Sequence, residues 1–186
     1  MKKRAFGATL AAGAVVAAVL TGSALARPAA MAGCGSMGGL VDKQAKTASY
    51  SLRLVVGLAE QMYTKAEVAK KHPKDGEVML GGAPMAMVDG ASARHLEVHV
   101  CNAMANRPVR SVYPKITVTD LTAHKTVIVP VMMMQGVTGG PADLHYGNNV
   151  SLPAGHRFQV VVTVKGERAT FRFVGPKGQA MSKGMG

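Results

Sequence analysis

Residues 158–174 read FQVVVTVKGERATFRFV, and this stretch decides the fold that we expect. Apolar residues recur at every second position on both sides of Lys165-Gly166, which is the pattern of β-strands with one buried face. A Lys-Gly pair between two such strands fits a tight turn. The stretch therefore predicts an antiparallel hairpin made of Phe158–Val164 and Ala169–Val174.

Further strands are expected on the N-terminal side of this hairpin, and helix-forming composition occurs in one stretch only, Glu60–Lys71. The expected strands are Leu52–Val56, His95–Cys101, Lys115–Thr119 and Val127–Val131. Residues 119–125 link two of them as a second hairpin. Several short strands with little helix favour an all-β, immunoglobulin-like antiparallel β-sandwich.

Composition and charge narrow the class of protein. The chain has 186 residues, no Trp and only 4% aromatic residues, so its core must be built mainly from aliphatic side chains and Met. That is enough apolar material to exclude bulk disorder, and the length excludes a multidomain enzyme. The net charge is +12. The basic residues are scattered and aromatics are few, so we expect attraction to an anionic envelope surface and no nucleic-acid partner.

The N-terminus carries a targeting signal. Lys2-Lys3-Arg4 precedes an uncharged apolar run that ends at about Leu20, and Ala24-Leu25-Ala26 follows. A basic region, an apolar region and an A-x-A site predict a secretory signal peptide over residues 1–26, and hence an extracytoplasmic location. An uncleaved membrane anchor is one alternative. The other is lipidation at Cys34, since Met31-Ala32-Gly33-Cys34 loosely resembles a lipobox.

The rest of the chain divides into three expected parts. Residues 27–47 are rich in Gly, Ala and Met and predict a flexible leader, residues 48–175 the sandwich domain, and residues 176–186 a flexible tail. The chain has two cysteines, Cys34 and Cys101. In an oxidising compartment such a pair suggests one disulfide.

The segment Arg94-His95-Leu96-Glu97-Val98-His99-Val100-Cys101 is the most informative for function. On a strand, its apolar residues point to one face, and His95, Glu97, His99 and Cys101 point to the other. Neighbouring side chains on that face lie about 6–7 Å apart, so a strand supplies two ligands to one metal ion. The remaining ligands must come from elsewhere. The alternative is a solvated polar strand face.

Two further segments carry ligand types. Val131-Met132-Met133-Met134 offers thioethers, which suit Cu(I), and His145 offers an imidazole, which suits Cu, Fe and Zn. Gly147-Asn148-Asn149 has the composition of a turn that would hold this imidazole in place. Core packing is the alternative for the methionines, and a backbone hydrogen bond in a loop is the alternative for His145. Met85-Ala86-Met87 lies in a Gly-flanked loop and offers extra thioethers.

Three short motifs resemble the periplasmic iron-transport accessory proteins that accompany the bacterial high-affinity ferrous iron permease. They are Arg94-His95-Leu96-Glu97, Val129-Pro130-Val131-Met132 and His145-Tyr146-Gly147-Asn148-Asn149-Val150. That family has a His-x-Glu strand, a Met-Pro-Met strand and a Gly-Pro-His-Tyr-Gly-x-Asn turn. The resemblance implies an immunoglobulin-like sandwich, a homodimer, and a copper or iron site near the dimer interface.

The resemblance also implies a ligand set. His95 and Glu97 match the His-x-Glu pair, His145 matches the turn histidine, and Met132 stands near the ligand methionine. The chain departs from the pattern in two ways. Alignment on Pro130 puts Val131 where the ligand methionine belongs, and the late loop that carries a further histidine in the family is here a tight hairpin. His99 or His156 would have to substitute.

The sequence therefore predicts an extracytoplasmic metal-binding protein that captures Fe(II) or copper and delivers it to a membrane iron importer. The expected ligands are His95, Glu97, His99, Met132 and His145. No phosphate-binding loop, nucleophile elbow or poised carboxylate pair is evident, so we do not expect an enzyme. Two alternatives remain: an immunoglobulin-like interaction module without metal, and a copper sequestration or resistance protein.

Overall fold

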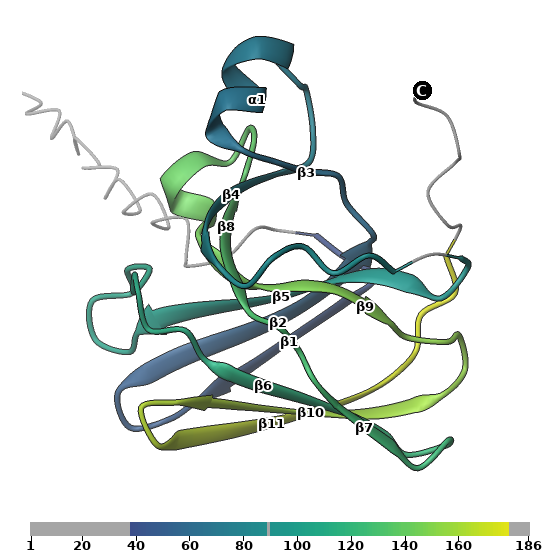
Figure 1. Ribbon diagram of the computed structural model, residues 1–186. Coiled ribbons are helices and arrows are strands. Elements are labelled where there is room, and N and C mark those ends of the chain that lie inside the picture. The colour runs from purple at the N-terminus through teal and green to yellow at the C-terminus, as the bar shows by residue number, and fades with distance from the viewer. Residues whose placement is uncertain (1–37, 89, 179–186) are drawn as a thin grey trace, which may run out of the picture. The chain divides into compact units, whose positions relative to one another are not determined.

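The computed structural model describes residues 38–88 and 90–178, and this part of the chain is mostly β-structure arranged in two sheets (Figure 1). The larger sheet has seven strands in the order β1-β2-β5-β9-β8-β4-β3, and the smaller has four in the order β11-β10-β6-β7. All neighbouring strands are antiparallel except β3 and β4. The prediction of an all-β sandwich is confirmed at this level.

The larger sheet consists of β1 (Val41–Lys46), β2 (Tyr50–Leu58), β3 (Met62–Tyr63), β4 (Glu77–Gly82), β5 (Ala93–Asn102), β8 (Met132–Gly136) and β9 (His145–Ser151). The smaller sheet consists of β6 (Lys115–Asp120), β7 (Lys125–Ile128), β10 (Arg157–Val164) and β11 (Glu167–Val174). One α-helix, α1 (Lys65–Lys71), and one 3-10 helix, η1 (Gly140–Asp143), complete the described elements.

The core lies between the two sheets. Alternate residues from the middle of β5 and from β10 enter it, and all of these side chains are buried. They are Leu96, Val98, Val100, Phe158, Val160, Val162 and Val164. Burying the apolar face of each sheet against the other is the main favourable contribution to such a fold.

Both predicted hairpins are present. In the β10–β11 hairpin, Lys165 and Gly166 have positive φ angles of 46° and 89°, as a two-residue turn of matching twist requires. In the β6–β7 hairpin, the Asp120 carboxylate accepts hydrogen bonds from the backbone N–H groups of Thr122 and Ala123. The Lys165-Gly166 turn thus forms as its composition predicted, and the Asp120 carboxylate stabilises the second turn.

Several elements differ from expectation. The predicted strand Val127–Val131 is shifted towards the N-terminus, because β7 runs from Lys125 to Ile128, where it pairs with β6. Residues 41–46 fall in the predicted flexible leader but form β1, because their backbone pairs with β2 and Val41 and Ala45 pack against the core. The predicted helix is shorter than Glu60–Lys71, because Met62–Tyr63 pairs with β4 as β3. The helix begins at Lys65, where Thr64 and Glu67 form a reciprocal capping box.

The strands β3, β4 and β8 stand with α1 above the face of β5 and β9 that points away from the smaller sheet (Figure 1). This part of the larger sheet covers the polar face of β5. Cys101 is buried on β5 and disulfide-bonded. Cys34, at which a lipid anchor was the alternative, and the predicted signal segment lie outside the described residues. Among the residues described, no helix is both long and apolar enough to span a membrane.

Candidate metal centre

The side chains of β5 alternate as predicted, but the polar face is buried. Leu96, Val98 and Val100 point into the sandwich core, and the other face carries His95, Glu97 and His99. Both imidazoles are 0% exposed and Glu97 is 7% exposed. The alternative of a solvated polar strand face therefore does not hold, since this row is closed off from solvent.

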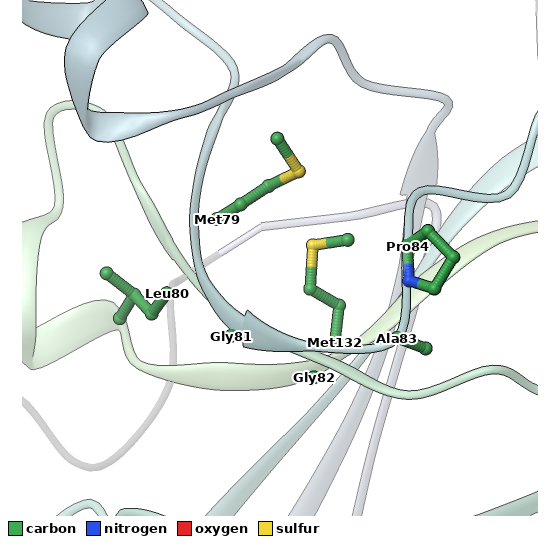
Figure 2. Close-up of a pocket in the computed structure, with 7 residues that line it drawn as sticks. All are labelled: Met79, Leu80, Gly81, Gly82, Ala83, Pro84 and Met132. Atoms are coloured by element: carbon green, nitrogen blue, oxygen red, sulfur yellow. The ribbon is translucent and has the colours of Figure 1, made fainter.

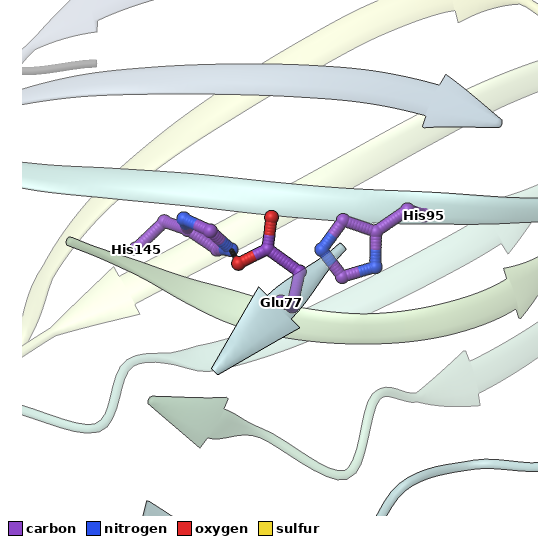
Figure 3. A group of neighbouring side chains, drawn as sticks. All are labelled: Glu77, His95 and His145. Carbon is purple, nitrogen blue, oxygen red and sulfur yellow. Dashed lines mark ion pairs between the residues drawn. The ribbon is translucent and has the colours of Figure 1, made fainter. Parts of the chain in front are cut away.

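His145 and Glu77 join this row from the neighbouring strands. His145 starts β9 opposite Met134 of β8, and Glu77 starts β4 opposite Gly136 of β8. Figure 3 shows Glu77 between the rings of His95 and His145. Ligand atoms of these three residues lie within 4.8 Å of one another, and the same holds for Glu97, His99 and His145. His145 thus belongs to two groups that could each hold a metal ion.

Hydrogen bonds orient two of the imidazoles. His95 Nδ1 lies 3.1 Å from Asn149 Oδ1, and His145 Nδ1 lies 2.8 Å from the carbonyl oxygen of Asp143. Both oxygens only accept, so both Nδ1 atoms carry the proton. This leaves a lone pair on each Nε2, and both Nε2 atoms are buried without a hydrogen bond. Fixing the tautomer through the second ring nitrogen is how metal-binding histidines are usually held.

The carboxyl of Glu77 faces this pair and is also hydrogen-bonded to the side chain of Glu60. Glu77 Oε2 lies 3.3 Å from His145 Nε2 and is one of the buried oxygens without a hydrogen-bond partner. Burial lowers the pKa of His145 to about 3, so the imidazole is neutral and the contact is not an ion pair. Buried polar atoms are rarely left unsatisfied in native proteins, and an ion between them is a standard explanation.

The two carboxyl groups of the centre differ in their electrostatics. Burial, together with the nearby Glu60 and Glu97 carboxylates, raises the pKa of Glu77 to about 10. Burial also acts to raise the pKa of Glu97, but the hydrogen bond with His99 and electrostatic interactions with the surrounding histidine side chains lower it to about 2. The ion-free centre therefore holds one ionised and one neutral carboxyl. A bound cation would favour ionisation of the second.

The predicted turn at Gly147-Asn148-Asn149 is wrong, because these residues lie within β9. Gly147 is required there since a Cβ at this position would overlap the carbonyl oxygen of Leu96 on β5. Asn149 orients His95, and Asn148 bonds to the backbone of Pro84, Ala86 and Pro130. A close strand contact and two buried amides thus explain the composition that looked like a turn.

Two other residues considered as ligands, Met132 and His156, are not members of the two three-residue groups. Met132 is buried on β8, where it packs with other methionines, and it pairs with Gly147 rather than with a histidine. His156, considered as a substitute ligand, instead bonds to Asp120 at 2.7 Å beside the smaller sheet. The β10–β11 turn holds Lys165 and Gly166 and no histidine.

Glu77 is the site residue that the sequence did not single out. The one sequence feature that could have indicated it is the position of a carboxylate at the start of a short apolar segment, Glu77-Val78-Met79-Leu80. This segment forms the first part of β4, in which Glu77 and Val78 are buried. Glu60, which lies in the stretch predicted to be helical, is a second buried carboxyl: it is hydrogen-bonded to Glu77, and burial and the charge of Glu97 raise its pKa to about 7. Neither residue lies near β5 in sequence, so only the folded sheet brings them to the histidines.

No protein-family model, no curated protein and no solved structure matches this chain. The resemblance to the iron-transport accessory proteins therefore stays a prediction.

Proposed function

We propose that this protein is an extracytoplasmic metal-binding protein that captures Fe(II) or copper and hands it to a membrane iron importer. One observation carries the proposal. Three buried ligand atoms, the Nε2 atoms of His95 and His145 and Oε2 of Glu77, converge without hydrogen-bond partners of their own. A buried polar atom left unpaired, such as His95 Nε2, costs about 1–3 kcal/mol, and a bound ion would offset that cost.

The donor set supports a borderline metal ion. Imidazole suits copper and iron, and carboxylate suits harder divalent ions such as Fe(II). All three ligand atoms belong to strands of one sheet, so the site is held rigidly and is preformed. The resemblance to the periplasmic accessory family supports delivery to an importer, and with it the immunoglobulin-like identity of the sandwich and a homodimer. The predicted secretory signal supports the location.

Isothermal titration of the protein with Fe(II) under anaerobic conditions, and with Cu(II), tests the proposal. We expect dissociation constants below about 10 μM, which corresponds to about −7 kcal/mol. His145→Ala should abolish binding, because His145 belongs to both three-residue groups. His156→Ala is the matched control, since His156 bonds to Asp120 away from the centre. Failure of both ions to bind would exclude the proposed function and favour a metal-free interaction module.

A further inference from the structure

A second buried cluster, separate from the sandwich core, consists of methionines only. Met62, Met132 and Met134 are each at most 3% exposed, and the partly buried Met79 and Met85 pack against them. We call these five residues the methionine cluster. Methionine often fills gaps among aliphatic residues, but this cluster contains no aliphatic member. The functional groups that this cluster offers to a ligand are therefore thioether sulfurs.

The strand register places this cluster directly beside the imidazole–carboxylate centre. Across the β4–β8 pair Met79 lies opposite Met134, and across the β8–β9 pair Met134 lies opposite His145. Directly opposed residues on antiparallel strands have Cβ atoms about 4.5–5.5 Å apart. On the other side of β4, Met62 of β3 lies opposite Glu77. The cluster thus flanks two residues of the centre.

A surface pocket opens onto the cluster. The pocket has a volume of about 340 Å³, and Met79 and Met132 are among its lining residues. Figure 2 shows the side chains of these two methionines extending into the same space. The other lining residues, Leu80, Gly81, Gly82, Ala83 and Pro84, carry no charge. Thioethers are thus the only side-chain ligands that the pocket offers to a metal ion.

The loop that carries Met85 is held over the cluster by one amide side chain. Asn148 of β9 donates hydrogen bonds to the carbonyl oxygens of Pro84 and Pro130, at 3.0 and 2.8 Å. Its Oδ1 accepts a hydrogen bond from the backbone N–H of Ala86 at 2.8 Å. These bonds fix the backbone on both sides of Met85. The partly buried fifth thioether is therefore positioned by the fold.

We propose that the methionine cluster binds Cu(I) from the pocket, as a thioether site distinct from the imidazole–carboxylate centre. Thioethers are soft, neutral ligands that favour Cu(I) over Fe(II) and other hard cations. Met134 links the cluster to His145, so a bound Cu(I) ion would have a path of ligands from the pocket to the centre, without a change of oxidation state. Only this onward transfer rests on the proposed function.

Methyl-labelled methionine provides a direct test, because each Cε resonance reports on its own sulfur. We expect about one equivalent of Ag(I), a redox-inert analogue of Cu(I), to shift resonances of the methionine cluster. The exposed Met87 and Met104, 77% and 97% exposed, are internal controls that should not shift at this ratio. Shifts confined to these two residues would show adventitious surface binding and overturn the proposal.

Affinity measurements on variants complete the test. Met79→Leu combined with Met132→Leu should weaken Cu(I) binding at least tenfold in competition with a Cu(I) chelator, and Met104→Leu should not. Exchange of Met for Leu conserves volume, so the variant should fold; the partly buried Met79→Leu alone is the milder alternative. Unchanged Cu(I) affinity in the double variant would refute the thioether site.

The two proposals can fail separately. His145→Ala should leave the Ag(I) shifts of the methionine cluster in place while it removes binding of Cu(II) or Fe(II). If the centre binds Cu(II) or Fe(II) but Ag(I) shifts no resonance of the methionine cluster, the thioether site is refuted and the proposed function stands. If Ag(I) shifts the resonances of the methionine cluster but the protein binds neither Cu(II) nor Fe(II), the proposed function is refuted and the thioether site stands.

Discussion

Asn149 offers a sharp test of how the metal centre is organised, because it contacts the expected ligand His95 without being a ligand itself. Its Oδ1 lies 3.1 Å from His95 Nδ1, and its Nδ2 donates to the carbonyl oxygen of Glu60 at 3.3 Å. Asn149 is 7% exposed, so water cannot readily take its place. Oδ1 also accepts a long hydrogen bond, 3.5 Å, from the backbone N–H of Glu60. Asn149→Leu keeps the size of the side chain but removes all three hydrogen bonds.

The expected cost follows from this geometry. Without the acceptor, the proton of neutral His95 is free to move to Nε2, and the ring loses the bond that aims its lone pair at Glu77. Loss of such an orienting partner lowers metal affinity by about 10–100-fold, or about 1.4–2.7 kcal/mol. Asn149→Asp should recover much of this affinity, because it restores the acceptor for His95.

Isothermal titration with Cu(II) would measure the effect, with the unfolding free energy recorded in parallel to separate affinity from stability. Asn102→Ala is the matched control, since Asn102 ends the same strand as His95 but bonds only to the turn that follows. Equal affinity of wild type and Asn149→Leu would refute the idea that His95 binds through an Nε2 oriented by Asn149.

Gly147→Ala should lower the unfolding free energy by about 1–3 kcal/mol or more, because its Cβ would overlap the carbonyl oxygen of Leu96. Gly57→Ala, where the new Cβ meets only ordinary contacts, should change it by less than about 0.5 kcal/mol in the same denaturant titration. A raised pKa keeps Glu77 neutral in the ion-free fold while the unfolded chain ionises, so stability should fall as pH rises from about 4.5 towards about 10. Thermal melts in EDTA should show this fall, and Glu77→Gln should flatten it; an unchanged profile in the variant would contradict the assignment. The lowered pKa of Glu97 acts at acid pH, where its contribution is present above about 4.5 and lost towards pH 2, and Glu97→Gln should reduce that loss in the same melts.

Much of the fold was readable because strands and turns leave local signals. The alternation in β5 and β10 confirmed which side chains enter the core, and Lys165-Gly166 closed the turn that its composition predicted. The wrong predictions arose where the same local composition is compatible with two different structures. Gly147 and its two neighbouring asparagines look like a turn, yet they serve close strand packing and buried hydrogen bonds inside β9.

The sequence by itself determined the two-sheet β architecture and the row His95-Glu97-His99 on one face of a strand, because a pleated backbone sends alternate residues to opposite sides. The tertiary structure alone decided that this face is buried rather than solvated. It also brought Glu77, 18 positions before His95, and His145, 50 positions after it, to the same point. Strand order in the larger sheet sets these meetings, and strand order depends on long-range pairing that no local pattern records.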